Sequence, residues 1–246
     1  MGTIYLVRHA QAAFGTDDYD RLTQIGFAQG RLLGAYFAAR HVRFDAVYTG
    51  TLRRHAETAR SLLERDSARD GTSRGCEPGD NEPRDRGPPV ECVSGLDEYK
   101  PDALMRAYMG GSSAAMPVAV RSDPERMREH FRRLREALLA WTEDRIQPAG
   151  MPAWRAFQDG AVAALVEARR RFADGNVLVV SSGGPIAAIV AAALEAPAPT
   201  AIELNLRIRN SSVTEFTMSA RRHQLLTFNA LPHLDTQADQ ALTTYA

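Results

Sequence analysis

The chain has 246 residues with 30 basic and 30 acidic side chains, so its formal net charge at pH 7 is zero. This balance excludes nucleic acid and an anionic membrane surface as expected main partners. No uninterrupted apolar run is long enough to span a bilayer. Cys76 and Cys92 lie in or beside a polar segment and lack metal-ligand spacing, so they predict no disulfide framework. We therefore expect a soluble, cytoplasmic protein with a substantial buried core.

The first half of the chain alternates predicted strands and helices. Residues 3–7 are apolar or β-branched without polar alternation, which is typical of a strand buried on both faces. A helix with one apolar face is expected over about 22–37, followed by a short strand at 45–49 and a helix over 52–63. This order implies parallel strands joined by right-handed crossovers.

Residues 64–91 interrupt this alternation because they are rich in charged residues, Gly and Pro and poor in apolar ones. They predict a mobile surface excursion, with a strand resuming at about 90–93. A helical insertion is expected at about 100–150. Within it, Ser122 and Glu125 fit a capping box that opens an amphipathic helix.

The remaining chain returns to the alternating pattern. A helix (152–172), a central strand (176–182) and a further helix (186–194) are predicted in that order. Two alternating runs, 212–218 and 223–228, are typical of a hairpin and indicate an antiparallel element at one side of the sheet. The last dozen residues are expected to fray. Altogether we predict a single α/β domain, a three-layer α/β/α sandwich with a mostly parallel sheet.

Polar or small residues follow four of the predicted strands. They are Arg8-His9, Gly50 to Arg54, Glu98 and Ser182-Gly183-Gly184. Because the carboxyl ends of parallel strands meet at one edge of a sheet, we expect these residues to converge. Guanidinium groups match phosphate oxygens, and backbone N–H groups at a helix start favour an anion. The set therefore predicts a site for a tetrahedral dianion beside a nucleophile, without the acidic or histidine cluster that a metal needs.

Five short blocks occur in order between residue 3 and about residue 234. They are Leu6-Val7-Arg8-His9-Ala10, Leu22-Thr23-Gln24-Ile25-Gly26 with Gln29, Gly50-Thr51-Leu52-Arg53-Arg54-His55-Ala56-Glu57-Thr58-Ala59, Leu96-Asp97-Glu98, and Val179-Val180-Ser181-Ser182-Gly183-Gly184, with Asn229, His233 and Leu234 after them. In the same order they resemble the blocks Leu-Val-Arg-His-Gly, Leu-Thr-x-x-Gly, Ser-Pro-Leu-x-Arg-Ala-x-x-Thr-Ala, Leu-x-Glu and Val-Val-Ser-His-Gly-Gly of the histidine phosphatases. The sequence thus resembles the phosphoglycerate mutase-like superfamily, and this resemblance implies that superfamily's fold for the whole chain, 1–246.

The resemblance also implies a phosphomonoester hydrolase that needs no metal or other cofactor. His9 would attack phosphorus and form a phosphohistidine, while Glu98 would protonate the leaving oxygen and then activate water. The residues that bind the phosphoryl group would be Arg8, Arg54, Ser182 and Gly183. The expected partner is a phosphorylated small molecule or a phosphoprotein. The sequence does not determine the oligomeric state, and a dimer is one of the open alternatives.

Three of the departures from the family's pattern concern the phosphate site or the residue after His9. Ser182 replaces the second histidine, which removes a cationic donor, and losing one such donor commonly costs about 10²–10³ in rate. Ala10 replaces a glycine, and Gly15 stands where the family has a phosphate-binding Asn. A second hypothesis is therefore a catalytically weakened member that binds a phosphorylated ligand or protein. A phosphomutase is a third and weaker one, because it must retain and re-donate the phosphoryl group.

Some assignments have structural alternatives. His9 can be read as a polar strand end and Glu98 as a surface loop carboxylate. Arg53 or Arg54 can be read as only solvated or as paired with Glu57. Ser182 fits a hydrogen-bond donor and a small packing residue equally well. His55 is a candidate compensating imidazole, but a helical His beside an Arg is more typical of a surface, where we expect it.

Overall fold

The computed structural model describes residues 2–13, 18–64, 88–111, 123–219, 221–236 and 239–245. The strands are β1 (Gly2–Arg8), β2 (Ala46–Thr49), β3 (Val90–Cys92), β4 (Asn176–Ser181), β5 (Val213–Met218) and β6 (His223–Ala230). The helices are α1 (Gln24–Ala39), α2 (Arg53–Leu63), α3 (Pro101–Tyr108), α5 (Pro124–Thr142), α6 (Trp154–Arg171), α7 (Gly183–Ala193) and α8 (Ala198–Asn205), with 3-10 turns η1 (Ser94–Leu96) and η2 (Asp239–Leu242).

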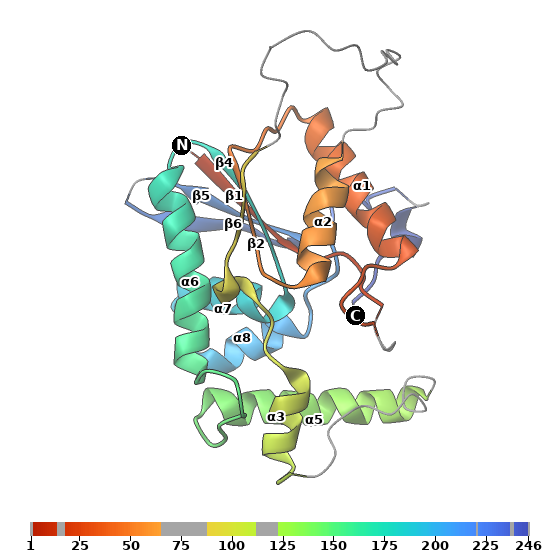
Figure 1. Cartoon of the computed structure of the whole chain (residues 1–246), viewed down its shortest axis with the longest axis vertical. Coiled ribbons are helices and arrows are strands. Elements are labelled where there is room, and N and C mark those ends of the chain that lie inside the picture. The colour runs from red at the N-terminus through yellow and green to blue at the C-terminus, as the bar shows by residue number, and fades with distance from the viewer. Residues whose placement is uncertain are drawn as a thin grey trace, which may run out of the picture.

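The strands form one six-stranded sheet in the order β3-β2-β4-β1-β5-β6 across the described residues (Figure 1). β3, β2, β4 and β1 pair in parallel, whereas β5 runs antiparallel to both β1 and β6. The prediction of a mostly parallel sheet with an antiparallel element at one side is therefore confirmed. The parallel order brings the carboxyl ends of β1, β2 and β4 to the same edge.

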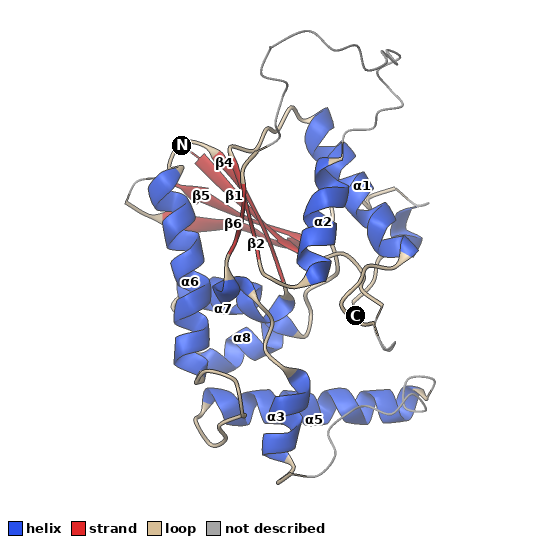
Figure 2. Cartoon of the chain, in the orientation of Figure 1, coloured by secondary structure: helices blue, strands red, loops and turns tan. Residues whose placement is uncertain are grey.

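Helices cover both faces of the sheet (Figure 2). On β1, Ile4 and Leu6 are fully buried in a cluster that includes residues of α6 and α7. Val7 points the opposite way, into a cluster that contains Leu33 of α1 and Leu62 of α2. A strand that is buried on both faces needs apolar residues in succession, which is what residues 3–7 provide. The three-layer α/β/α sandwich is confirmed.

A third apolar cluster joins α3 and α5 to α7 and α8. Trp141 at its centre is fully buried, and its indole N–H donates to the carbonyl oxygen of Pro152 at 3.1 Å. The ring of Trp154 meets it edge-on with 5.2 Å between ring centroids. Helices α3 and α5 fall in the stretch 100–150 that the sequence assigns to a helical insertion. The assignment of 1–246 to one domain stays a prediction.

The structure corrects three local expectations. Helix α5 is capped by Asp123, whose carboxylate accepts from the N–H groups of Glu125 and Arg126, whereas the expected cap Ser122 lies outside the described residues. Helix α7 begins at Gly183, three residues earlier than expected, so the glycines form its first turn. The C-terminal residues 239–245 form η2 and a stretch that accepts hydrogen bonds from Arg8 and Asn210, instead of fraying.

The expected excursion at 64–91 falls almost entirely on residues 65–87, which lie outside the described ranges. Its last residues belong to β3, which pairs in parallel with β2. None of the described helices combines the length and the apolar character that crossing a membrane requires.

Candidate active site

His9 follows β1 directly, and the sheet fixes its backbone. Its N–H donates to the carbonyl oxygen of Ser181 on β4 at 2.8 Å, and its carbonyl oxygen accepts from the N–H of Ser211 at 3.3 Å. The imidazole is 3% exposed, and its Nδ1 lies 2.8 Å from the carbonyl oxygen of Ala10. Since a carbonyl oxygen only accepts, we assign the proton to Nδ1. The lone pair of the neutral ring is then on Nε2.

Electrostatics keep the His9 ring neutral. Burial lowers its pKa well below the usual value, and the nearby charges of Arg8 and Arg54 and the neighbouring His55 ring lower it further. The bond to Ala10 opposes this shift only in part. An unprotonated nitrogen is what a nucleophile requires, so the environment holds His9 in the reactive form at neutral pH.

Arg54 comes from the first turn of α2, whose start is stabilised by Asp20. The Asp20 carboxylate accepts from the backbone N–H of Arg53 at 2.8 Å and from Nη1 of Arg54 at 2.7 Å. The Arg54 side chain is 7% exposed, and its Nη2 lies 3.5 Å from Oγ of Ser182. Arg53 instead pairs with Glu57 at 2.7 Å, on an exposed side of the helix. Of the two adjacent arginines, Arg54 is therefore the one that faces the site.

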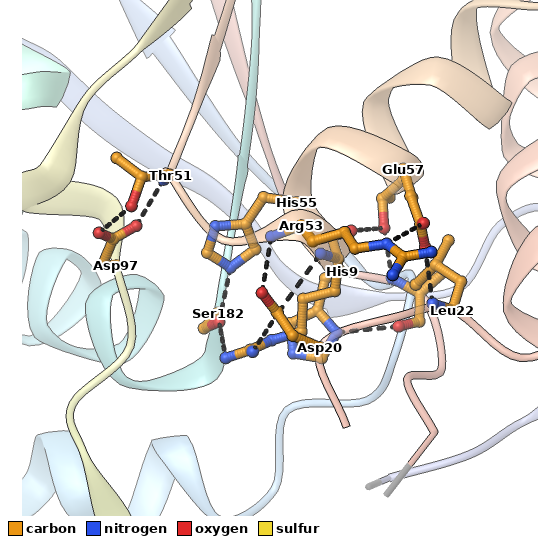
Figure 3. A network of polar contacts seen from close by, with 12 residues as sticks. His9, Asp20, Leu22, Thr51, Arg53, His55, Glu57, Asp97 and Ser182 are labelled. Carbon is orange, nitrogen blue, oxygen red and sulfur yellow. Dashed lines mark hydrogen bonds and ion pairs between the residues drawn. The ribbon is translucent and has the colours of Figure 1, made fainter. Parts of the chain in front are cut away.

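His55 contradicts the expectation of a surface residue. Its side chain is fully buried, its Nε2 lies 2.7 Å from Oγ of Ser182, and its ring centroid lies 5.8 Å from that of His9 (Figure 3). Burial and the charge of Arg54 lower its pKa to about 3. A second neutral imidazole thus lies beside His9.

Glu98 reaches the site from the loop after η1. Its Oε2 accepts from the N–H of Gly184 at 3.3 Å, and its Oε1 accepts from the N–H of Tyr99 at 3.2 Å. A Cβ at Gly184 would overlap Oε1 of Glu98, so glycine permits this close approach. The alternative of a solvated loop carboxylate does not fit this half-buried position at the start of α7.

Burial raises the pKa of Glu98, and the charge of Arg54, the bond from Gly184 and the charge of Arg8 oppose the rise. A carboxyl group with a raised pKa keeps its proton to higher pH and serves as an acid. The charges of Arg8 and Arg54 each lower the pKa of both His9 and Glu98. The four predicted residues therefore lie close enough together for their charges to interact.

Arg8 has different partners from Arg54. Its Nη1 donates to the carbonyl oxygens of Ile208 and, at 2.6 Å, of Tyr245. The C-terminal stretch is held there by further bonds: Asn210 N–H donates to the carbonyl oxygen of Thr244 at 2.9 Å. Burial lowers the pKa of Arg8, and within the part of the chain that the structure describes its buried Nε has no hydrogen-bond partner.

The other predicted positions have structural surroundings of their own. Gly183 is buried in the first turn of α7, where a Cβ would lie 2.5 Å from Oδ1 of Asn205. Ala10 is fully buried, and its N–H donates to Oγ1 of Thr58 at 3.0 Å. Its φ is not positive, so this position does not need glycine. Gly15 lies outside the described residues.

Two acidic residues were missed by the sequence reasoning. Asp20 holds Arg54, as described above, and Asp97 accepts from both the N–H and the hydroxyl of Thr51 at 2.6 Å, which ties the Glu98 loop to the end of β2 (Figure 3). Only the position of Asp97 beside Glu98 hints at its contact, and nothing in the spacing of Asp20 does. Within the described ranges, no group of three or more His, Cys, Asp or Glu residues could hold a metal ion.

Comparison with protein families matches residues 4–70 and 121–231 to the model of the Histidine phosphatase superfamily (branch 1). No curated protein matches the chain. Solved structures share its fold. One is phosphoserine phosphatase from Entamoeba histolytica in complex with 3-phosphoglyceric acid, 18% identical with a TM-score of 0.60 over 95% of this chain and 100% of that chain.

A second is a putative alpha-ribazole-5'-P phosphatase from Escherichia coli, 19% identical with a TM-score of 0.61 over 93% of this chain and 96% of that chain. A third is mycobacterial glucosyl-3-phosphoglycerate phosphatase, 20% identical with a TM-score of 0.56 over 93% of this chain and 98% of that chain. At these identities the likeness establishes the fold.

Proposed function

The chain belongs to the Histidine phosphatase superfamily (branch 1), and from this premise we propose that it hydrolyses phosphomonoesters through a phosphohistidine formed on His9. The observation that carries the proposal is the state of His9: a buried ring whose Nδ1 bonds to Ala10 and whose pKa is lowered by burial and by two arginines. This arrangement leaves Nε2 as a free nucleophile beside groups suited to bind a dianion.

In the first step, Nε2 of His9 forms a bond to phosphorus while the bond from phosphorus to the ester oxygen breaks. The leaving oxygen takes a proton from the carboxyl group of Glu98, whose protonated form is favoured by its raised pKa. In the second step, the Glu98 carboxylate takes a proton from water, and the resulting hydroxide attacks phosphorus. The N–P bond breaks, the lone pair returns to Nε2, and orthophosphate leaves.

The charge on the transferring group would be balanced by Arg8 and Arg54, with the hydroxyl of Ser182 and the N–H of Gly183 as further donors. None of these steps calls on a metal ion or a nucleotide, so we propose a metal-independent enzyme. Two of the structural relatives carry phosphoserine phosphatase or glucosyl-3-phosphoglycerate phosphatase in their names, and one contains 3-phosphoglyceric acid. By analogy we propose a phosphorylated small molecule as substrate.

A second candidate function is binding of a phosphorylated ligand with little or no turnover. It is favoured by one observation, the pairing of Arg54 with the Asp20 carboxylate at 2.7 Å, which reduces the charge available to a phosphoryl group. Ser182 in place of a cationic histidine points the same way. In this case the site would bind orthophosphate but would not release it from an ester.

Hydrolysis of p-nitrophenyl phosphate by the wild type and by His9→Ala separates the two functions. We expect His9→Ala to lose more than about 10³-fold in kcat, because the proposed covalent intermediate forms on His9. Rapid quenching with labelled substrate should trap an acid-labile phosphoenzyme in the wild type and none in the variant. The control is His223→Ala, because His223 pairs with Met218 at the opposite edge of the sheet from His9.

Turnover that persists in His9→Ala would contradict the enzymatic proposal. Orthophosphate binding by calorimetry without any turnover in the wild type would favour the binding function instead.

A further inference from the structure

His55 is a buried imidazole that the proposed reaction leaves without a role. It is fully buried beside the nucleophile, and its Nε2 lies 2.7 Å from Oγ of Ser182 (Figure 3). Its Nδ1 is buried and has no hydrogen-bond partner among the described residues. A polar ring is costly to bury in this way, so its retention beside a reactive histidine calls for an explanation.

The space for this ring depends on two other residues. A Cβ at Gly50 would overlap Nδ1 of His55 and would lie 2.7 Å from its Cε1, so any larger residue at position 50 would displace the ring. A larger side chain at Ser182 would likewise collide with Nε2, which is already within hydrogen-bond distance of Oγ. The ring therefore fits only because positions 50 and 182 are both small.

The same three positions are departures from the blocks that the sequence resembles. Gly50 stands for Ser, His55 for Ala and Ser182 for His. Taken singly, the three departures show no connection. Taken together, they place one imidazole in the first turn of α2, where the family's blocks have it at the end of β4. The steric fit among Gly50, His55 and Ser182 makes them a single structural exchange.

The hydrogen bonds around Ser182 suggest how the moved imidazole acts. A hydroxyl oxygen accepts two hydrogen bonds and donates one. We assign the proton of His55 to Nε2, so that Oγ of Ser182 accepts from Nε2 at 2.7 Å and from Nη2 of Arg54 at 3.5 Å and keeps its own proton for a third group. With the proton of His55 on Nε2, the buried Nδ1 carries only a lone pair, which costs less to leave unpaired than an N–H group.

Resting on the function proposed above, we propose that His55 is a positioning residue that orients the Ser182 hydroxyl to donate to the transferring phosphoryl group. His55 and Ser182 together take the place of the family's second histidine and carry no charge. The group that donates to the substrate is the serine hydroxyl. Because the pKa of His55 is lowered to about 3, the ring contributes a directed hydrogen bond and no net charge in the empty site.

The test is a set of variants assayed with p-nitrophenyl phosphate, with thermal unfolding to verify folding. We expect His55→Ala and Ser182→Ala each to lower kcat about 10- to 100-fold with less than about a threefold change in KM. The double variant should lose no more than either single one, since both remove the same donor. His55→Gln, whose amide can also donate to Ser182, should recover part of kcat.

The sharpest variant returns the imidazole to β4. We expect His55→Ala combined with Ser182→His to regain at least about tenfold in kcat over His55→Ala. Ser182→His alone should gain nothing, because the new ring would collide with His55. His223→Ala serves as the matched control, since it removes a ring with a buried, unpartnered Nδ1 at the far edge of the sheet and should leave kcat unchanged.

The inference is overturned if His55→Ala keeps kcat within twofold of the wild type, or if the losses in His55→Ala and Ser182→Ala multiply in the double variant. In either case the wild type would still be active, and its activity would still depend on His9. A wild type without turnover that depends on His9 would overturn the proposed function, and this inference with it, so the two failures are distinguishable.

Discussion

Two arginines flank the nucleophile, and their partners differ. Nη1 of Arg54 is ion-paired with the carboxylate of Asp20 at 2.7 Å, whereas Nη1 of Arg8 donates to the carbonyl oxygens of Ile208 and Tyr245. A carboxylate neutralises a guanidinium charge, but a carbonyl dipole only orients it. We therefore expect Arg8 to offer its charge to an incoming dianion without competition, whereas Arg54 contributes fully only when its contact with Asp20 weakens.

Among the variants that test this difference between the arginines, the largest loss of activity is expected when each arginine is removed in turn. Arg8→Gln and Arg54→Gln should each lower kcat/KM about 10²–10³-fold, because each removes a preorganised donor for the phosphoryl oxygens. Arg54→Gln also leaves the Asp20 carboxylate unpaired beside the dianion. Adding Asp20→Asn should therefore recover about tenfold in the Arg54→Gln background and nothing comparable in the Arg8→Gln background. Steady-state kinetics with p-nitrophenyl phosphate measure all four variants.

Equal recovery in both backgrounds would mean that Asp20 acts through the general field of the site and not through Arg54. The asymmetry between the two arginines would then be wrong.

The pH dependence of kcat/KM also distinguishes the two arginines, with a smaller expected effect. In the proposed mechanism Glu98 must carry a proton to protonate the leaving oxygen, so we expect activity to fall as the pH rises through its pKa. Burial raises that pKa, and of the two arginine charges that oppose the rise, Arg54 has the larger effect. Removing either cation raises the pKa of Glu98 further. The alkaline limb of kcat/KM should then move to higher pH by up to about one unit, and further in Arg54→Gln than in Arg8→Gln.

The substrate for this measurement is an alkyl phosphate such as glycerol phosphate, whose leaving oxygen needs protonation. p-Nitrophenyl phosphate, with a much better leaving group, is the comparison and should show a weaker limb. A limb that moves to lower pH in either variant would contradict Glu98 as the acid.

The convergence of the main candidate residues at one edge of the sheet was predictable from the sequence because local pattern and topology agree. Strand-forming runs end directly at His9 and, by way of the 176–181 strand, at Ser182, and parallel pairing brings those ends together. The start of α2 at Arg53 likewise follows from a short strand and a turn. Each of these assignments depends on residues close in sequence and on one rule of sheet topology.

The surroundings of the site were not predictable in this way because they depend on distant residues. The burial of His55 requires a small residue at Ser182, 127 positions away, and the partner of Arg8 at Tyr245 lies 237 positions away. A helical position beside Arg54 gives no local sign of which side chain turns inward. Such contacts follow from packing, and the sequence pattern carries no direct signal for them.

The smallest expected effect is that of Asp20→Asn alone, which releases Arg54 without removing it. The Asp20 side chain is 38% exposed, so solvent screens the pair and its contribution is modest. Asparagine keeps an oxygen that can accept from the N–H of Arg53, which preserves the stabilised start of α2. We expect orthophosphate to inhibit the variant about three- to fivefold more strongly than the wild type.

Asp18→Asn is the matched control, because Asp18 pairs only with the exposed side chains of Arg53 and Arg21 among the ion pairs of the described residues, at 3.3 and 3.6 Å. Its inhibition constant for orthophosphate should not change. Weaker inhibition of Asp20→Asn would mean that the carboxylate holds Arg54 in its binding orientation and does not compete with the ligand. The two arginines would then differ in how they are positioned, and not in how much charge they offer.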